Sequence, residues 1–240
     1  MKQLFLLVFL AAILMISCGE FFGNRVRGNG KIKSEARASG TFTGVDVSGA
    51  MDLYIKQDSI YTIKIETDEN LLQHIEVIND GEKLIIRPER GYNLKPTGSI
   101  KVYVSSPVFK KLEASGACDI FSENKITSDA ELQIDLSGSC DAKIELNTPK
   151  VYANLSGSCN INLKGETKDF TTNGSGSTDI KCMDLMAENV SIEISGSGNA
   201  EVFASVKLDV DISGSGSVSY KGNAKVNQKV SGSGSVQKVD

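Results

Sequence analysis

Residues 132–146 read Leu-Gln-Ile-Asp-Leu-Ser-Gly-Ser-Cys-Asp-Ala-Lys-Ile-Glu-Leu, and residues 151–163 read Val-Tyr-Ala-Asn-Leu-Ser-Gly-Ser-Cys-Asn-Ile-Asn-Leu. Apolar and polar residues alternate in both stretches, and the alternation continues through the Ser-Gly-Ser segment. A period of two puts every second side chain on one face, which indicates β-strands with one buried face. We interpret each Ser-Gly segment as a corner where the chain bends but keeps its inside-outside sense, with inward glycines leaving room for the backbone.

The Ser-Gly pair recurs along the chain. It stands at Ser115, Ser137, Ser156, Ser175, Ser195, Ser213 and Ser231, in steps of 22, 19, 19, 20, 18 and 18 residues. One copy cannot bury its apolar face alone, but parallel copies stacked about 4.8 Å apart form a continuous core. The sequence therefore predicts an all-β fold, a right-handed parallel β-helix (solenoid) with rungs of about 18–22 residues. An antiparallel barrel or a stack of hairpins is the alternative, although the corners lack the Asn-Gly or Asp-Gly turns of tight hairpins.

Residues 41–108 keep β-character but leave the repeat. Alternation around Ser48-Gly49 predicts a first rung, Asp80-Gly81 predicts a hairpin turn, and residues 71–75 predict one short helical turn. We expect this region to form an N-terminal β elaboration that caps the solenoid, because a bare rung would expose unpaired backbone groups.

The start of the chain predicts export. An apolar run extends from Leu4 to Ile16 and is followed by Ser17 and Cys18, an ending that resembles a bacterial lipobox. Cleavage would leave Cys18 as the N-terminal residue carrying acyl chains such as palmitate, which hold a protein stably on a membrane. An ordinary cleaved signal with a chance cysteine is the alternative.

These features divide the chain into three parts. We expect residues 1–17 to be a lipoprotein signal peptide, residues 18–38 a flexible tether with disorder to about Ala36, and residues 39–240 the β-helix domain. The predicted location is the bacterial outer membrane, with the body on its periplasmic face or on the cell surface.

Composition argues against several functions. The formal net charge is -4 and no run of Lys or Arg stands out, so no nucleic-acid partner is expected. The single histidine, His74, has no evident partner and is expected on the surface or in the cap. Aromatic residues are few and are expected mainly inward or in the cap, whereas sugar-cleaving β-helices need aromatic platforms beside catalytic carboxylates. We predict no catalytic residues, no metal and no cofactor; a polysaccharide-active enzyme is the less favoured alternative.

Three cysteines share one register, because Cys118, Cys140 and Cys159 each lie three residues after a corner serine. Their Cα atoms would lie about 5 Å apart, within disulfide range, but stacked parallel side chains point the same way. Small buried thiols that fill the core are the favoured interpretation. Cys182 is also expected inward, and the oxidation state of all four stays open.

The next register faces outward and holds carboxylates and amides. It comprises Asp119, Asp141, Asn160, Asp179 and Asn199. Such a ladder could face a ligand or a hard cation such as calcium, which takes six to eight oxygen ligands. Hydrogen bonds between the side chains of neighbouring rungs explain the same pattern without a metal.

Two stretches resemble a known family. They are residues 42–53, Phe-Thr-Gly-Val-Asp-Val-Ser-Gly-Ala-Met-Asp-Leu, and residues 112–119, Leu-Glu-Ala-Ser-Gly-Ala-Cys-Asp. From about residue 40 onward the chain resembles the "putative auto-transporter adhesin, head GIN domain" family, a domain of unknown function frequent in lipoproteins of Bacteroidetes. The resemblance implies a β-helical fold and an adhesive role, and it brings no catalytic or binding residues with it.

The combined prediction is a lipid-anchored envelope protein with a non-catalytic binding or adhesion role towards a glycan or protein ligand. Repeated ledges of serine hydroxyls would suit weak, multivalent binding. A periplasmic structural or scaffolding lipoprotein is the alternative. The few residues after the last rung also suggest end-to-end self-association.

Overall fold

The computed structural model describes residues 23–240, so the predicted signal peptide and Cys18 lie outside the described residues. Within this part, a single 3-10 turn accompanies the strands, and no helix is long and apolar enough to cross a membrane. The elements are β1 (Asn24–Arg27), β2 (Ile32–Arg37), β3 (Gly44–Gly49), β4 (Met51–Gln57), β5 (Thr62–Asp68), η1 (Leu72–His74), β6 (Ile75–Asp80), β7 (Lys83–Pro88), β8 (Tyr92–Lys95), β9 (Ile100–Ser106), β10 (Lys111–Gly116), β11 (Asp119–Ser122), β12 (Ile126–Thr127), β13 (Leu132–Gly138), β14 (Asp141–Gly157), β15 (Asn160–Gly176), β16 (Asp179–Gly196), β17 (Asn199–Gly214), β18 (Ser217–Lys221), β19 (Lys225–Gly232) and β20 (Ser235–Lys238).

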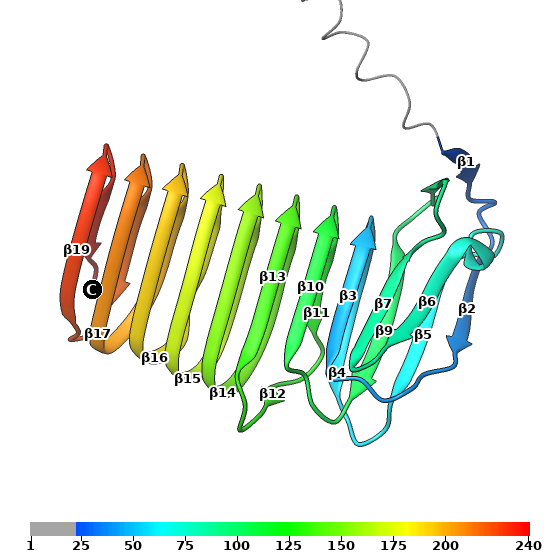
Figure 1. Cartoon of the computed structure of the whole chain (residues 1–240), viewed down its shortest axis with the longest axis horizontal. Coiled ribbons are helices and arrows are strands. Elements are labelled where there is room, and N and C mark those ends of the chain that lie inside the picture. The colour runs from blue at the N-terminus through cyan, green and yellow to red at the C-terminus, as the bar shows by residue number, and fades with distance from the viewer. Residues whose placement is uncertain (1–22) are drawn as a thin grey trace, which may run out of the picture.

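The solenoid is a stack of parallel strands that are in register at the corners (Figure 1), with local register shifts after Asn162 of β15 and after Cys182 and Ala187 of β16. Ser48 of β3 pairs with Ser115 of β10, and the corner serines then pair rung by rung as far as Ser231 of β19. Strands β14 to β17 each extend from one corner to the next and so contribute to more than one face. The predicted parallel solenoid, including its first rung at Ser48-Gly49, is confirmed.

The interior follows the predicted parity. In the copy that decides the fold, Leu132, Ile134 and Leu136 are buried before the corner, and Cys140, Ala142, Ile144 and Leu146 are buried after it. Each fully buried Leu or Ile side chain stabilises the fold by about 1.5–3 kcal/mol. Because every rung contributes the same inward positions, the core continues along the stack.

The first glycine of each corner does not fill the role predicted for it. Gly138 is exposed rather than inward and has a φ of +102°, and a Cβ at this position would meet the Gly116 carbonyl oxygen at 2.5 Å. Glycine is therefore required by backbone conformation and by the close approach of the preceding rung. The second glycine of the corner, for example Gly198, is buried as predicted.

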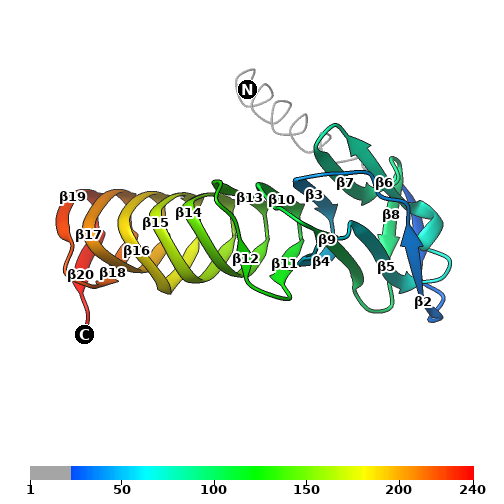
Figure 2. The same ribbon diagram turned by 90° about the horizontal axis from the view of Figure 1, so that it is seen from below.

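The N-terminal elaboration forms a cap of mostly antiparallel strands (Figure 2). Strand β6 pairs with β7 through the predicted turn after Asp80, and β5 pairs with β9. Strands β7 and β9 then pair in parallel with β3 and β4, which continues the sheet from the cap into the first rung. The predicted short helical turn is η1.

The expected flexible tether is wrong for residues 24–37. Strand β1 pairs with β8, and β2 pairs antiparallel with β5. The fully buried Asp68 accepts hydrogen bonds from the Gly30 backbone at 2.7 Å and from the Thr97 backbone and hydroxyl, both at 2.9 Å. Backbone pairing and this carboxylate hold a segment whose composition alone looks like a linker.

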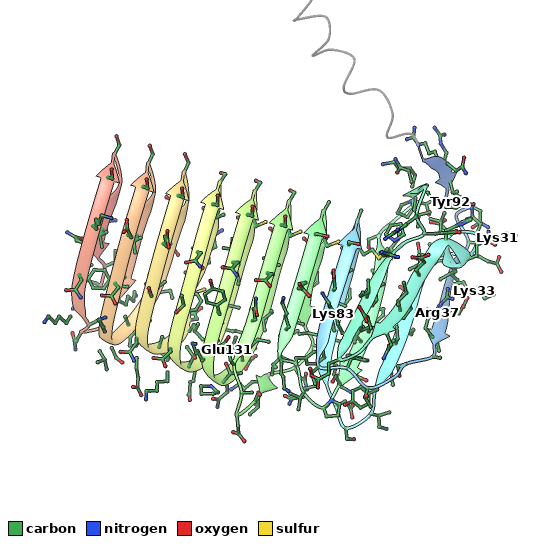
Figure 3. All side chains as sticks on the ribbon, viewed as in Figure 1. Lys31, Lys33, Arg37, Lys83, Tyr92 and Glu131 are labelled. Atoms are coloured by element: carbon green, nitrogen blue, oxygen red, sulfur yellow. The ribbon has the colours of Figure 1, made fainter. Side chains whose placement is uncertain are left out.

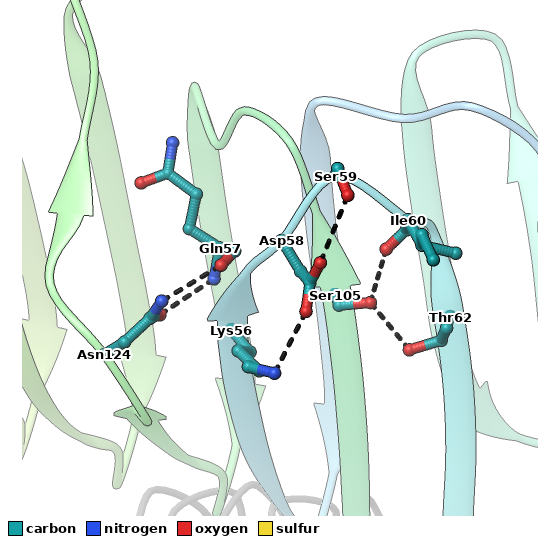
Figure 4. Close-up of polar contacts among 8 residues, drawn as sticks. All are labelled: Lys56, Gln57, Asp58, Ser59, Ile60, Thr62, Ser105 and Asn124. Atoms are coloured by element: carbon teal, nitrogen blue, oxygen red, sulfur yellow. Dashed lines mark hydrogen bonds and ion pairs between the residues drawn. The ribbon is translucent and has the colours of Figure 1, made fainter.

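Side-chain amides join the cap to the solenoid (Figure 4). The Gln57 backbone N–H donates to Asn124 Oδ1 and the Asn124 amide donates to the Gln57 carbonyl, each at 2.9 Å. Beside them, the hydroxyls of Thr62 and Ser105 share a 2.6 Å hydrogen bond, and Ser105 donates to the Ile60 carbonyl. The first two bonds fix β4 against the loop that follows β11, and the others fix β5 and the preceding loop against β9.

Candidate functional site

A groove of about 640 Å³ follows the face that precedes the Ser-Gly corners, which we call the groove face. Its polar lining residues are Asp46, Glu113, Ser115, Asp135, Ser137, Asn154, Ser156, Asn173, Ser175, Glu193 and Ser195. They come from six successive strands, β3, β10, β13, β14, β15 and β16. The parallel register thus turns one sequence position per rung into a continuous polar channel.

Serine hydroxyls form one wall of this groove. Ser137, Ser156, Ser175 and Ser195 are exposed and stand in one column. A serine hydroxyl both donates and accepts hydrogen bonds. The serine column therefore offers evenly spaced groups of the kind that recognise sugar hydroxyls or peptide amides.

The second wall is a column two residues before each corner serine, which we call the acid-amide column. Its members are Asp46, Glu113, Asp135, Asn154, Asn173, Glu193, Asp211 and Lys229. Sequence reasoning missed this column, although its constant offset from the corner serine was a visible signal. It places carboxylates and amides along the whole groove.

Amides in these columns donate in one direction. The Asn154 amide donates to Asp135 at 2.8 Å, and the Asn173 amide donates to Asn154 Oδ1 at 3.1 Å and to the Tyr152 hydroxyl at 2.8 Å. Each of these bonds runs from a rung to the preceding rung. The ladder links neighbouring rungs and consumes amide hydrogens that a ligand could otherwise use.

Lysines pair with the carboxylates at the end of the groove nearest the cap. Lys83, labelled in Figure 3 near the junction of cap and solenoid, lies 2.8 Å from Glu113, and Lys111 lies 3.0 Å from Glu113 and 3.2 Å from Asp135. Burial raises the pKa of Glu113, but hydrogen bonds from the two lysines outweigh it, so the pKa is lowered. Glu113 is therefore ionised, and Glu113 and Asp135 are both paired with lysine.

The predicted ladder of Asp119, Asp141, Asn160, Asp179 and Asn199 lies on the face that follows the corners, which we call the second face. The structure brings all five into one column, together with Asp52 of β4, which sequence reasoning left out. Asn160 donates to Asp141 at 2.7 Å and Asn199 to Asp179 at 3.3 Å. Hydrogen bonds between rungs account for this ladder, and no group of three or more His, Cys, Asp or Glu side chains in residues 23–240 is arranged to hold a metal ion.

Charge repulsion acts at the cap end of this second-face ladder. The pKa of Asp119 is raised, first by burial and then by the neighbouring carboxylates of Asp141 and Asp52. A backbone hydrogen bond from Asp141 to the Asp119 carboxylate, at 3.2 Å, opposes the shift.

Four cysteines lie inward, as expected from their register, and they are free thiols. Cys118, Cys140, Cys159 and Cys182 are all fully buried. Burial raises the pKa of Cys118 and of Cys182 to about 12. The pKa of Cys159 is also raised, by its hydrogen bond with Cys140 and by burial. Protonated buried thiols of this kind fill space and are poor nucleophiles.

Aromatic residues lie mainly inward or in the cap region, as expected, and two of the cap-region rings form an outward stack with Phe121 of β11. Tyr103, Tyr54 and Phe121 stack on the outside of the second face, with ring centroids 5.0 and 5.2 Å apart. Lys64 lies 4.1 Å from the Tyr103 ring centroid and Lys143 lies 5.8 Å from that of Phe121. The ring faces are occupied by one another and by the lysines, so the stack joins cap to solenoid and presents no open platform for a sugar ring.

His74 does have partners, contrary to the sequence expectation, although it does lie in the cap. Its Nδ1 is 2.8 Å from the Glu89 carboxylate and its ring stacks on Tyr92 at 4.2 Å. The chain contains one histidine. Since it is engaged in the cap, it is remote from the serines of the groove.

The fold and these surfaces define a parallel β-solenoid that presents repeated polar side chains along a shallow groove. Over residues 41–224 the chain matches the family described as "Putative auto-transporter adhesin, head GIN domain", and it belongs to that family. No match is found among curated proteins.

Solved structures share the fold. A putative adhesin from Bacteroides fragilis NCTC 9343 superposes with a TM-score of 0.84 at 20% identity, over 89% of this chain and all of that one. A putative adhesin from Parabacteroides merdae ATCC 43184 has a TM-score of 0.72 at 25% identity, over 90% of this chain and all of that one. A putative lipid binding protein from Parabacteroides distasonis ATCC 8503 has a TM-score of 0.71 at 24% identity, with 90% and 100% coverage.

Proposed function

We propose that this protein is a lipid-anchored, non-catalytic adhesin of the bacterial envelope that holds a glycan chain in the groove. The observation that carries the proposal is the groove itself, whose exposed serine column repeats once per rung. A glycan chain also repeats its hydroxyl groups, so one weak contact per rung accumulates along the solenoid.

The side chains of the groove favour binding over catalysis. Nucleophilic catalysis by serine needs a base within hydrogen-bond reach, and the single histidine is bound to Glu89 in the cap. Hydrogen bonds from Lys83 and Lys111 lower the pKa of Glu113, so this carboxylate lacks the raised pKa of a general acid, and Asp135 is paired with Lys111. Membership of an adhesin family supports the same conclusion.

The glycan proposal is tested by applying the full chain to an array of neutral, cationic and anionic glycans. We expect binding to a subset of chains of several sugars, with little retention of single sugars, because each rung contributes weakly. Absence of binding to every glycan would contradict the proposal and favour a scaffolding role.

Anchoring and location need separate tests. The lipobox-like Ser17-Cys18 supports acylation at Cys18, so metabolic labelling with a fatty acid should mark the protein and Cys18→Ser should abolish the label. Protease shaving of intact cells, with a periplasmic control, then distinguishes adhesion at the cell surface from periplasmic scaffolding. Removal of the body supports the adhesin, and protection supports scaffolding.

End-to-end self-association is a further part of this proposal. Val230 in β19 is 39% exposed, and its strand pairs with β17. Sedimentation at increasing protein concentration tests it, and a monomer at all concentrations would contradict it.

A further inference from the structure

The groove contains one place where hydrogen-bond acceptors meet without a donor. The Asn173 amide nitrogen donates to Tyr152 and Asn154, both on the preceding rung. Both amide hydrogens are therefore used, and Asn173 Oδ1 is left as an acceptor. The residue opposite Asn173 on the next rung is Glu193, whose carboxylate can only accept.

Glu193 also has no charge partner among the described residues. It is exposed, and no side-chain hydrogen bond or ion pair reaches its carboxylate within residues 23–240. The column continues at Asp211, which is paired with Lys229 at 3.1 Å. At the other end of the groove, Lys83 pairs with Asp46 and Glu113, and Lys111 pairs with Glu113 and Asp135. Among the described residues that line the groove, Glu193 is thus the carboxylate without a lysine partner.

Hydroxyl groups flank this position. Ser175 lies two residues after Asn173 and Ser195 lies two residues after Glu193, and both serines line the groove. A ligand group that fits here carries several hydrogen-bond donors and a positive charge, whereas a carboxylate or phosphate would be repelled.

We infer that the groove takes an amino sugar, with the ligand's ammonium group bound between Asn173 Oδ1 and the Glu193 carboxylate and its hydroxyls on Ser175 and Ser195. This inference rests on the proposed glycan-binding function and names the ligand class. The ammonium supplies the donors that both acceptors lack, and neighbouring sugars extend along the serine column towards the cap.

The test compares three oligosaccharides of equal length on the full chain: a glucosamine oligomer, its N-acetylated counterpart and an oligogalacturonate. We expect the glucosamine oligomer to bind most tightly, the neutral N-acetylated oligomer less tightly and the anionic oligomer least. The preference for glucosamine should shrink with added salt, because the carboxylate is exposed.

Glu193→Gln is the matching variant, because it removes the charge and keeps the shape. It should weaken binding of the glucosamine oligomer roughly three- to tenfold and leave the N-acetylated oligomer unchanged. Glu201→Gln on β17 removes the same charge from the second face and should change neither affinity.

The outcomes separate the two claims. Equal binding of the charged and acetylated oligomers, preference for oligogalacturonate, or an unchanged affinity in Glu193→Gln overturns the amino-sugar inference while glycan binding stands. Tight binding of a trilysine peptide with no binding of any oligosaccharide overturns both, as does the absence of binding to all probes.

Discussion

Asn154 donates its side-chain amide to the Asp135 carboxylate of the preceding rung across 2.8 Å. The same direction of donation recurs at Asn160 with Asp141, at Asn189 with Asp169 and at Asn227 with Asp209. A parallel solenoid stacks like residues on like, so a column of carboxylates alone would repel itself. Alternating Asn with Asp removes the repulsion and adds a hydrogen bond between rungs.

This relationship predicts the effect of Asn154→Asp. The new carboxylate faces Asp135 and cannot donate the hydrogen bond that the amide made. The free energy of unfolding at pH 7 should therefore fall by about 1–2 kcal/mol. Repulsion raises the pKa of the new group in the folded state, so the loss is complete at neutral pH and shrinks as the pH falls and the group is protonated. Urea unfolding at pH 7 and about pH 4 measures both effects.

Asn162→Asp is the matched control for that variant. Asn162 lies in β15 on the second face and pairs with Lys143 and Lys181 on the neighbouring rungs. A carboxylate there meets positive charge on both sides, and stability at pH 7 should be unchanged or slightly higher. Equal destabilisation by Asn154→Asp and Asn162→Asp would show that the stability of the ladder does not depend on the sign of the charges on neighbouring rungs.

Gly138→Ala tests the corner geometry. The φ of +102° alone costs a non-glycine residue about 1–3 kcal/mol, and the Cβ would also approach the Gly116 carbonyl oxygen to 2.5 Å. We expect a loss of at least 2 kcal/mol in the free energy of unfolding. Gly98→Ala, where a Cβ meets nothing within 4 Å, should be close to neutral, and a similar loss in both variants would contradict the close approach of rungs at the corner.

Asp68→Asn should loosen the segment 24–37 from the cap. Burial raises the pKa of Asp68, but hydrogen bonds from Thr97 and Gly30 outweigh it, so its pKa is below the usual 3.8. Its contribution is therefore present above pH 3.8 and is lost as the pH falls through the lower, folded-state pKa. At pH 7 the variant should lose roughly 2 kcal/mol, because an amide hydrogen faces the backbone N–H donors.

Hydrogen exchange checks this effect locally. The amides of Gly30 and Thr97 should exchange faster in Asp68→Asn at pH 7, while those of the solenoid rungs keep their protection. Unchanged protection at Gly30 would mean that the strand pairing of β2 alone holds the segment.

The four buried thiols should resist alkylation in the folded protein. Complete burial shields all four thiols from the reagent, and the raised pKa values of Cys118, Cys159 and Cys182 leave little thiolate there at about pH 8. Iodoacetamide followed by peptide mass spectrometry should modify Cys118, Cys140, Cys159 and Cys182 only after denaturation. Rapid modification of any of them under native conditions would show that the core opens at that rung.

The sequence predicts most of the solenoid, because inward parity and corner spacing are local patterns. Leu132, Ile134 and Leu136 are buried as their period of two requires, and the predicted second-face ladder aligns. The acid-amide column has an equally local signal at two residues before each corner serine. Its link to a binding site becomes visible only in the structure, where the stacked rungs form the groove that this column lines.

Other features depend on strand pairings that the periodicity of the sequence does not indicate. Tyr54, Tyr103 and Phe121 come together because β9, β4 and β11 are neighbours in space. The segment 24–37 has few apolar residues, so its composition favours a linker, and its order comes from pairing with β5 and β8 and from Asp68. In each case the partner is a strand of the cap that lies far away in the sequence.

The assignment of the groove as the glycan site is tested most directly by comparing two single variants of the full chain on the glycan array. Each variant enlarges one side chain of β15, one on the groove face and one on the second face. Ser175→Tyr places a ring in the groove, and Asn162→Tyr places the same ring on the second face of β15. Both positions are exposed, so both variants should fold. We expect Ser175→Tyr to abolish glycan binding and Asn162→Tyr to leave it intact. Unchanged binding by Ser175→Tyr would contradict the assignment of the groove as the binding site.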